Sequence, residues 1–173
     1  MIELPSIPRR EFGFERTTCG CDECTRNCRF IPGSLVPSDL ERMRDALSPG
    51  QDIFEWASEN LLASPGAVVM YRGEMYRIPT LVPARGPDGM ACKFLTEDWK
   101  CSIHTVAPYG CAFVDMHMTD EEGTRRSTAG LMAINNDWMA NGLYSQVHQH
   151  LEAERNIAPP ANELRRKMAK ATL

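Results

Sequence analysis

The spacing of seven cysteines constrains this chain more than any other feature of its sequence. Four of them fall within ten residues in the pattern C-x-C-x2-C-x3-C, and three more follow at intervals of nine and ten: Cys19, Cys21, Cys24 and Cys28, then Cys92, Cys101 and Cys111. A C-x2-C pair lets two sulfur atoms converge on one ion across a tight turn, and the cysteine four residues later can join if the turn continues as helix. The spacing therefore predicts a metal site built from thiolates, with all seven cysteines as candidate ligands.

Disulfides and inert buried thiols are the alternative explanations of these cysteines. The first five residues, Met1 to Pro5, contain no apolar stretch typical of a signal peptide, and apolar runs such as Ala67–Met70 are too short to span a membrane. The expected location is therefore the reducing cytoplasm, where structural disulfides are rare. Inert thiols need apolar surroundings, whereas the first group stands among charged and polar residues. Metal binding is the favoured prediction.

A histidine is needed if every thiolate is to belong to a four-coordinate site, because seven ligands do not divide by four. His104 follows Cys101 by three residues, and C-x2-H is a workable chelate. Seven cysteines with His104 would complete two four-coordinate centres. One centre with three N-terminal cysteines and one later cysteine is the simpler alternative, with His104 only hydrogen-bonding nearby. His117, six residues after Cys111, is a weaker candidate, and His148 and His150 are predicted to be surface residues of a helix.

Three segments of the chain resemble the YkgJ-like family of zinc- or iron-chelating cysteine-cluster proteins, the CxxCxxCC type. The segments are CDECTRNC (Cys21–Cys28), CKFL (Cys92–Leu95) and CSIHTVAPYGCAF (Cys101–Phe113), so the resemblance covers about residues 19–114. The chain departs from the family where Cys28 stands alone instead of in an adjacent pair, and where Cys19 is an extra cysteine. It also has His104 in place of tyrosine and Ala107-Pro108 in place of Arg-Pro. The resemblance implies a metal site and no particular activity.

The sequence leaves both the metal and the role open. Zinc would be a redox-silent link between the two cysteine groups, whereas an iron–sulfur cluster would make the protein an electron carrier, a sensor or part of a redox enzyme. The number of thiolates and the lack of a C-x2-C pair in the second group favour an iron–sulfur cluster slightly. We therefore expect an electron-transfer or accessory module for a partner protein. The alternatives are a metal-dependent or iron–sulfur enzyme, with no catalytic residue identified, and a structural zinc protein with an interaction role.

Hydrophobic periodicity predicts a small α+β domain with a cysteine-rich loop region, a small antiparallel sheet and a long C-terminal helical part. The expected elements are an irregular region over 1–37, helices over 38–47 and 52–62, strands over 67–71 and 75–82, a helical stretch after 124 weakened at Gly142, and a last helix from about Asn162. Ser64-Pro65-Gly66 is expected to end the second helix. Residues 1–120 form the cysteine region, on which the C-terminal helices of 121–173 are expected to pack.

The charge of the chain argues against two classes of partner. The formal net charge is −4, so no global positive field attracts nucleic acid or anionic lipid. We expect neither a nucleic-acid nor a membrane partner, and the sequence does not indicate an oligomeric state. Asn135, Asn136, Asp137 and Asn141 form a polar set on the predicted long helix. These side chains either line a pocket or face water, and the second interpretation is favoured.

Overall fold

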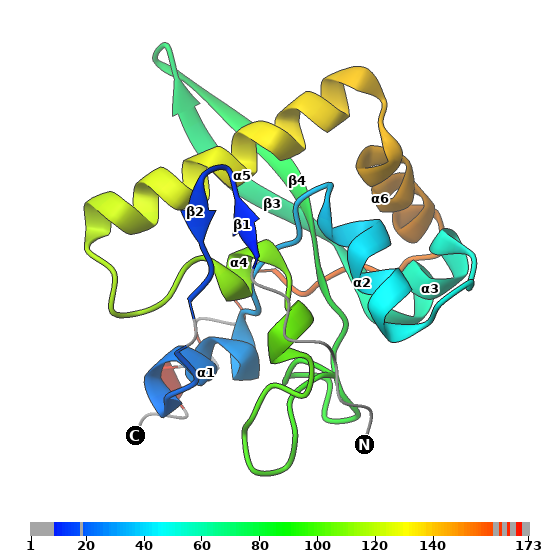
Figure 1. The fold of residues 1–173 in the computed structure, drawn as a ribbon. Coiled ribbons are helices and arrows are strands. Elements are labelled where there is room, and N and C mark those ends of the chain that lie inside the picture. Colours follow the sequence, from blue (N-terminus) through cyan, green and yellow to red (C-terminus); the bar gives the residue numbers. More distant parts are fainter. Residues whose placement is uncertain (1–8, 18, 161–162, 164–165, 167–168, 171–173) are drawn as a thin grey trace.

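A long antiparallel hairpin organises the fold. It consists of β3 (Leu61–Tyr71) and β4 (Glu74–Pro83), and in the computed structural model the helices pack along it while its tip projects at the end opposite α1 (Figure 1). The structure describes residues 9–17, 19–160, 163, 166, 169 and 170. The remaining elements, in chain order, are β1 (Arg10–Glu11), β2 (Phe14–Glu15), α1 (Asp22–Phe30), α2 (Asp39–Leu47), α3 (Ile53–Asn60), the 3-10 helix η1 (His104–Val106), α4 (Tyr109–Ala112), α5 (Asp120–Ala140) and α6 (Leu143–Ala153). The prediction of a single α+β domain with a small antiparallel sheet is confirmed.

The hairpin contains both predicted strands, but each strand is longer than predicted. Arg72 and Gly73 both have positive φ, 51° and 82°, as a two-residue type I′ turn requires. The stretch Ser64-Pro65-Gly66 lies inside β3, where the register with β4 shifts between Ser64 and Ala67, so the prediction that it ends the preceding helix is wrong. Gly66 is needed at this bulge, because its φ is +78° and a Cβ atom there would lie 1.8 Å from the carbonyl oxygen of Ile78.

The helices begin and end close to the predicted positions. Asp52 caps α3 by accepting hydrogen bonds from the backbone N–H groups of Phe54 and Glu55. The long helical stretch breaks at Asn141, whose φ is +49°, and resumes as α6 after Gly142. The predicted last helix, from about Asn162, falls mostly outside the described residues. The longest helix is α5, and no helix among the described residues is long and apolar enough to cross a membrane.

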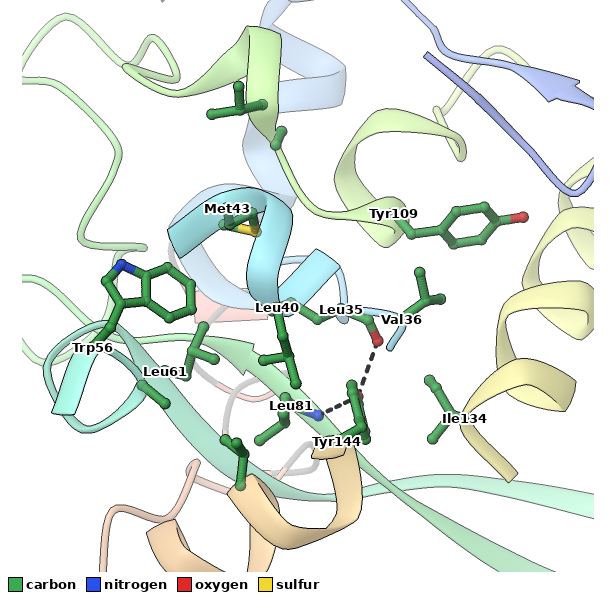
Figure 2. Close-up of a cluster of buried hydrophobic side chains, with 14 of the residues drawn as sticks. Leu35, Val36, Leu40, Met43, Trp56, Leu61, Leu81, Tyr109, Ile134 and Tyr144 are labelled. Atoms are coloured by element: carbon green, nitrogen blue, oxygen red, sulfur yellow. Dashed lines mark hydrogen bonds between the residues drawn. The ribbon is translucent and has the colours of Figure 1, made fainter. Parts of the chain in front are cut away.

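The hydrophobic core lies where α2, α3 and α6 meet the hairpin. The fully buried Tyr144 of α6 accepts a hydrogen bond from Leu81 N at 2.6 Å and donates one to Leu35 O at 2.9 Å (Figure 2). One hydroxyl group thus joins α6, β4 and the segment before α2. The large apolar side chains around it are Val36, Leu40, Met43, Trp56, Leu61, Tyr109 and Ile134. Burying each such side chain contributes about 1.5–3 kcal/mol, so this core stabilises the fold without help from the cysteines.

The N-terminal region is more regular than predicted. Residues expected to be irregular form the short hairpin β1–β2 and the nine-residue helix α1. Asp22 and Glu23 stand in the first turn of α1 and Arg29 in its last, which complements the helix dipole. Cys21 is the residue just before α1, and Cys24 and Cys28 lie within the helix. The helical geometry of α1 therefore decides which other ligands these three cysteines can approach.

Candidate metal centres

Four ligand residues gather at the start of α1. The sulfur atoms of Cys19, Cys21 and Cys24 and one ring nitrogen of His117 all lie within 4.8 Å of one another. The closest contact described is between Cys21 Sγ and His117 Nε2, at 3.2 Å. Cys21 and His117 are exposed, whereas Cys19 and Cys24 are half-buried. This surface centre can hold a metal ion, and in the described part of the chain it is the one group of three or more such residues with ligand atoms so close together.

The surface centre joins two distant segments of the chain. Cys21 is the N-cap residue of α1, and Cys24 stands in the first turn of the helix. His117 comes from the loop between α4 and α5, where its backbone N–H donates to Asp115 at 2.9 Å. The other carboxylate oxygen of Asp115 accepts from the Thr17 hydroxyl at 2.5 Å, and that hydroxyl accepts from Cys19 N at 3.2 Å. A chain of side-chain hydrogen bonds therefore fixes both segments.

The charges of the surface centre favour cation binding. The backbone amide of Cys24 and then the His117 ring lower the pKa of Cys21 to about 6. Cys21 in turn raises the pKa of His117. Burial, together with the neighbouring Cys19 and Cys21, raises the pKa of Cys24 to about 12. One thiolate is thus already formed at neutral pH, while a cation must displace the proton of Cys24 when it binds.

The other four cysteines gather near the far end of α1, and we call Cys28, Cys92, Cys101 and Cys111 the buried group. Cys92 N donates a hydrogen bond to Cys28 O at 2.8 Å. Cys28, Cys101 and Cys111 line one cavity of about 670 Å³, and Cys19 and Cys24 of the surface centre line the same cavity. Cys92 is buried, with 8% of its surface exposed. The four cysteines therefore lie in one region of the fold, although they come from α1, the loop after β4 and α4.

Electrostatics also connects the members of the buried group. Burial first, and then the neighbouring thiols, raise the pKa of Cys92 to about 12 and that of Cys101 to about 11. The pKa of Cys111 lies well above its usual value, because of burial and then of Cys28, Cys92 and Cys101. Every pair among the four is thus close enough to interact. Two guanidinium groups act on the same thiols: Arg85 lowers the pKa of Cys92, and Arg16 lowers that of Cys101.

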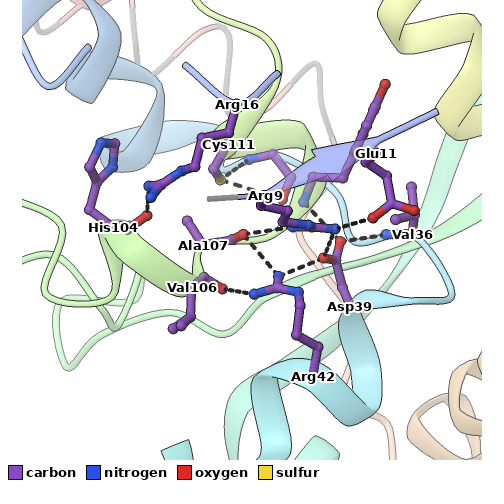
Figure 3. Close-up of polar contacts among 12 residues, drawn as sticks. Arg9, Glu11, Arg16, Val36, Asp39, Arg42, His104, Val106, Ala107 and Cys111 are labelled. Atoms are coloured by element: carbon purple, nitrogen blue, oxygen red, sulfur yellow. Dashed lines mark hydrogen bonds and ion pairs between the residues drawn. The ribbon is translucent and has the colours of Figure 1, made fainter. Parts of the chain in front are cut away.

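A buried carboxylate holds the segment that carries Cys111. Asp39 is fully buried and pairs with Arg9 at 2.6 Å and with Arg42 at 2.7 Å (Figure 3). It also accepts hydrogen bonds from the backbone N–H groups of Val36 and Tyr109, both at 2.8 Å. Asp39 thereby ties the N-terminal segment and the start of α2 to α4, two residues from Cys111.

The sequence-based groups differ from those in the structure. Cys28 was expected with Cys21 and Cys24, but it lies with the later cysteines, since its carbonyl accepts a hydrogen bond from Cys92 N. Cys19, which the family resemblance leaves out, takes its place. The N-terminal and the later cysteines, as the sequence groups them, do come together, since the Cys28 carbonyl accepts a hydrogen bond from Cys92 N.

The histidines also differ from expectation. His117, the weaker candidate, lies among the ligands, and nothing in its sequence context marks it except its distance from Cys111. The His104 carbonyl accepts a hydrogen bond from Arg16 (Figure 3), and His104 lines the cavity that cysteines of both groups share. Its role as a ligand stays a prediction. The prediction that His148 is a surface residue is wrong, because it is 2% exposed and contacts Ser64 O at 3.0 Å.

The polar set on α5 does not line the cavity. Asn135, Asn136 and Asn141 are exposed, and Asp137 accepts hydrogen bonds from the backbone N–H groups that start α6. All seven cysteines have free thiols. The arrangement therefore offers metal chelation as its clearest chemistry. No family model, no curated protein and no solved structure matches this chain.

Proposed function

We propose that this protein is a metal-binding module whose surface centre, Cys19, Cys21, Cys24 and His117, holds one zinc ion. The observation that carries the proposal is the mutual separation of the four ligand atoms, none more than 4.8 Å. In a tetrahedral zinc site the ligands lie 2.0–2.3 Å from the ion, so they lie about 3.3–3.8 Å from each other. Small movements of the side chains reach that geometry. Thiolates bound to different iron atoms of a cluster stand farther apart, so this centre favours zinc over the iron–sulfur cluster that the cysteine count suggested.

The proposed role of the zinc is structural. Four protein ligands leave no open coordination position, as in zinc sites that hold a fold together. The ion would join α1 to the loop between α4 and α5, which the Thr17–Asp115 hydrogen bond already brings together. The module would act in the reducing cytoplasm as an accessory to a partner protein. We also propose that the chain is a member of the YkgJ-like family, whose zinc or iron chelation is in line with this function.

The test compares two histidine variants. His117→Ala removes a proposed ligand, and His104→Ala is the matched control outside the surface centre. We expect His117→Ala to weaken zinc binding by more than the roughly 10–100-fold that loss of a supporting residue costs, and His104→Ala to leave it unchanged. Zinc content and competition with a chromophoric chelator measure the affinity. Cobalt substituted for zinc reports tetrahedral coordination by its visible spectrum. Full zinc affinity in His117→Ala would refute the proposal.

A further inference from the structure

We infer that Cys21 and Cys24 are a redox-active pair, which a small disulfide compound converts into a reversible Cys21–Cys24 disulfide. The bond follows from the geometry of the two cysteines and needs no metal. Its consequence, oxidative release of zinc from the surface centre, is a regulation that rests on the proposed function. Structural disulfides are rare in a reducing compartment, so this bond would form under oxidising conditions and be reduced again afterwards.

The sulfur atoms of the surface centre lie close enough for two of them to form a bond. The Sγ atoms of Cys19, Cys21 and Cys24 are all within 4.8 Å of one another, and a disulfide bond is about 2.05 Å long. Rotation about the side-chain bonds of two cysteines can close a gap of this size. Cys21 and Cys24 enclose two residues, as in the C-x2-C motifs of redox-active cysteines. Cys19 and Cys21 enclose only one, so Cys21 and Cys24 are the favoured pair.

The two cysteines of this pair differ in exposure, as thiol–disulfide exchange requires. Cys21 is exposed and can meet an oxidant in solution, whereas Cys24 is half-buried behind it. Cys21 is the N-cap residue of α1, and Cys24 stands in the first turn of the same helix. His117 Nε2 contacts Cys21 Sγ at 3.2 Å and holds this sulfur at the surface. Cys21 is therefore placed to react first, and Cys24 to react second.

The exchange has two steps, and both balance. The Cys21 sulfur attacks one sulfur of an oxidant R–S–S–R, so that a Cys21–S–S–R bond forms, the bond within the oxidant breaks and one R–S⁻ leaves. The Cys24 sulfur then attacks Cys21 Sγ, which forms the Cys21–Cys24 bond and releases the second R–S⁻. Two thiols of the chain are oxidised and one disulfide is reduced to two thiols. The protons of the two cysteines pass to the released groups.

The disulfide would remove two of the four proposed zinc ligands. The thiolate is the form of cysteine that binds a metal, and a disulfide has none. Cys19 and His117 alone do not complete a tetrahedral zinc site. Without the ion, the hydrogen bond between Thr17 and Asp115 is the remaining link described between the two segments of the centre. Oxidation would thus loosen α1 from the loop between α4 and α5.

The experiment treats the full chain, zinc-loaded and zinc-free, with hydroxyethyl disulfide. This oxidant is uncharged, so the acidic residues Asp22 and Glu23 next to Cys21 do not repel it. Free thiols are then blocked, and mass spectrometry maps the disulfides. We expect a Cys21–Cys24 disulfide in both samples, transfer of the zinc to a chromophoric chelator, and renewed zinc binding after reduction with dithiothreitol. Mapping the unaltered chain needs no variant to fold.

Two serine variants in the zinc-free chain separate the roles of the cysteines. Cys24→Ser removes the second reactant, so the reaction should stop at a mixed disulfide between Cys21 and the oxidant. Cys19→Ser is the matched control, because it removes the third sulfur of the same centre. In this variant the Cys21–Cys24 disulfide should form as in the unaltered chain.

Three outcomes would overturn the inference. A disulfide that joins Cys19 to Cys21 or to Cys24 would replace the proposed pair. Separate adducts on Cys21 and Cys24 would show that their sulfur atoms do not bond. Zinc retained at full occupancy after complete oxidation would exclude the regulation. A chain that forms the Cys21–Cys24 disulfide but never binds zinc would contradict only the zinc proposal, and a chain that binds zinc but forms no disulfide would contradict only the redox-active pair.

Discussion

The two metal-ligand groups lie at the two ends of one short helix and differ in almost every physical respect. The surface centre contains a histidine, holds its ligand atoms within 4.8 Å and exposes Cys21 and His117. The buried group contains only thiols and does not hold three of their sulfur atoms within 4.8 Å of one another. Cys24 and Cys28 stand four residues apart, yet they belong to different groups. Ligand grouping in this protein therefore follows helical position and burial more than distance along the sequence.

The two groups are also supported differently. Side-chain hydrogen bonds through Thr17 and Asp115 position the surface centre. The buried group depends on backbone contacts at Gly33 and Gly110 and on the Asp39 network next to α4. Exposed side chains adjust easily, whereas packed backbone does not. We therefore expect substitutions outside the ligands to disturb the buried group far more than the surface centre.

The largest effect is expected from Asp39→Ala. This change leaves the guanidinium groups of Arg9 and Arg42 without their buried partner and two backbone N–H groups without an acceptor. Breaking a buried ion pair in this way costs about 3–5 kcal/mol, and urea unfolding measures the loss. Because α4 carries Cys111, the arrangement of the buried group should be disturbed as well, while zinc at the surface centre is retained.

Asp45→Ala on the same helix is the matched control for this change. Asp45 also pairs with an arginine, Arg44, but its side chain is 64% exposed. Exposed pairs contribute about 1 kcal/mol or less, so stability and zinc content should be nearly unchanged. Equal losses in the two variants would show that the buried group does not depend on the Asp39 network.

A smaller effect is expected when alanine replaces a glycine beside each group. The two glycines are Gly33, beside the buried group, and Gly20, beside the surface centre. In Gly33→Ala the new Cβ would overlap the backbone of Gly110, and relieving such overlap costs about 1–3 kcal/mol. In Gly20→Ala, between Cys19 and Cys21, the new Cβ has nothing within 4 Å. The midpoint of thermal unfolding should therefore fall in the first variant and stay near wild type in the second. Equal tolerance of both changes would contradict the rigidity assigned to the buried group.

Local chemistry made much of this molecule predictable. The patterns over 67–71 and 75–82 predicted the two strands of the hairpin, and the pattern over 38–47 predicted α2. Both depend on residues close in sequence, whose conformational preferences act without tertiary context. Ser64-Pro65-Gly66 has the same local character, but pairing with β4 makes it a bulge rather than a helix end. The prediction failed there because a contact with a later strand decided the outcome.

The candidate ligands were predictable by residue type, but their partners were not. His104 is near Cys101 in sequence, whereas His117 reaches Cys21 across 96 positions because Asp115 and Thr17 connect their loops. No spacing rule contains that contact. The same holds for Asp39 and Gly33, which no motif distinguishes from other residues of their kind. Their importance comes from long-range packing, which a single sequence does not display.

The smallest expected effect concerns the pH dependence of the surface centre after zinc removal. His117 and the backbone amide of Cys24 lower the pKa of Cys21 to about 6, and Cys21 raises the pKa of His117. The thiolate–imidazolium pair therefore exists above about pH 6 and up to the raised pKa of His117. It is lost as the pH falls and Cys21 is protonated, and again as the pH rises and His117 is deprotonated.

Alkylation rates measured residue by residue can detect this pair in chain stripped of zinc. At pH 7 iodoacetamide should modify Cys21 first, because the thiolate is the reactive form. Cys24 of the same centre, with its pKa raised to about 12, should react far more slowly. The rate at Cys21 should fall about tenfold for each pH unit below its pKa, and His117→Ala should shift that profile toward higher pH. Equal rates at Cys21 and Cys24, or a profile that His117→Ala does not move, would show that the imidazole does not activate this centre.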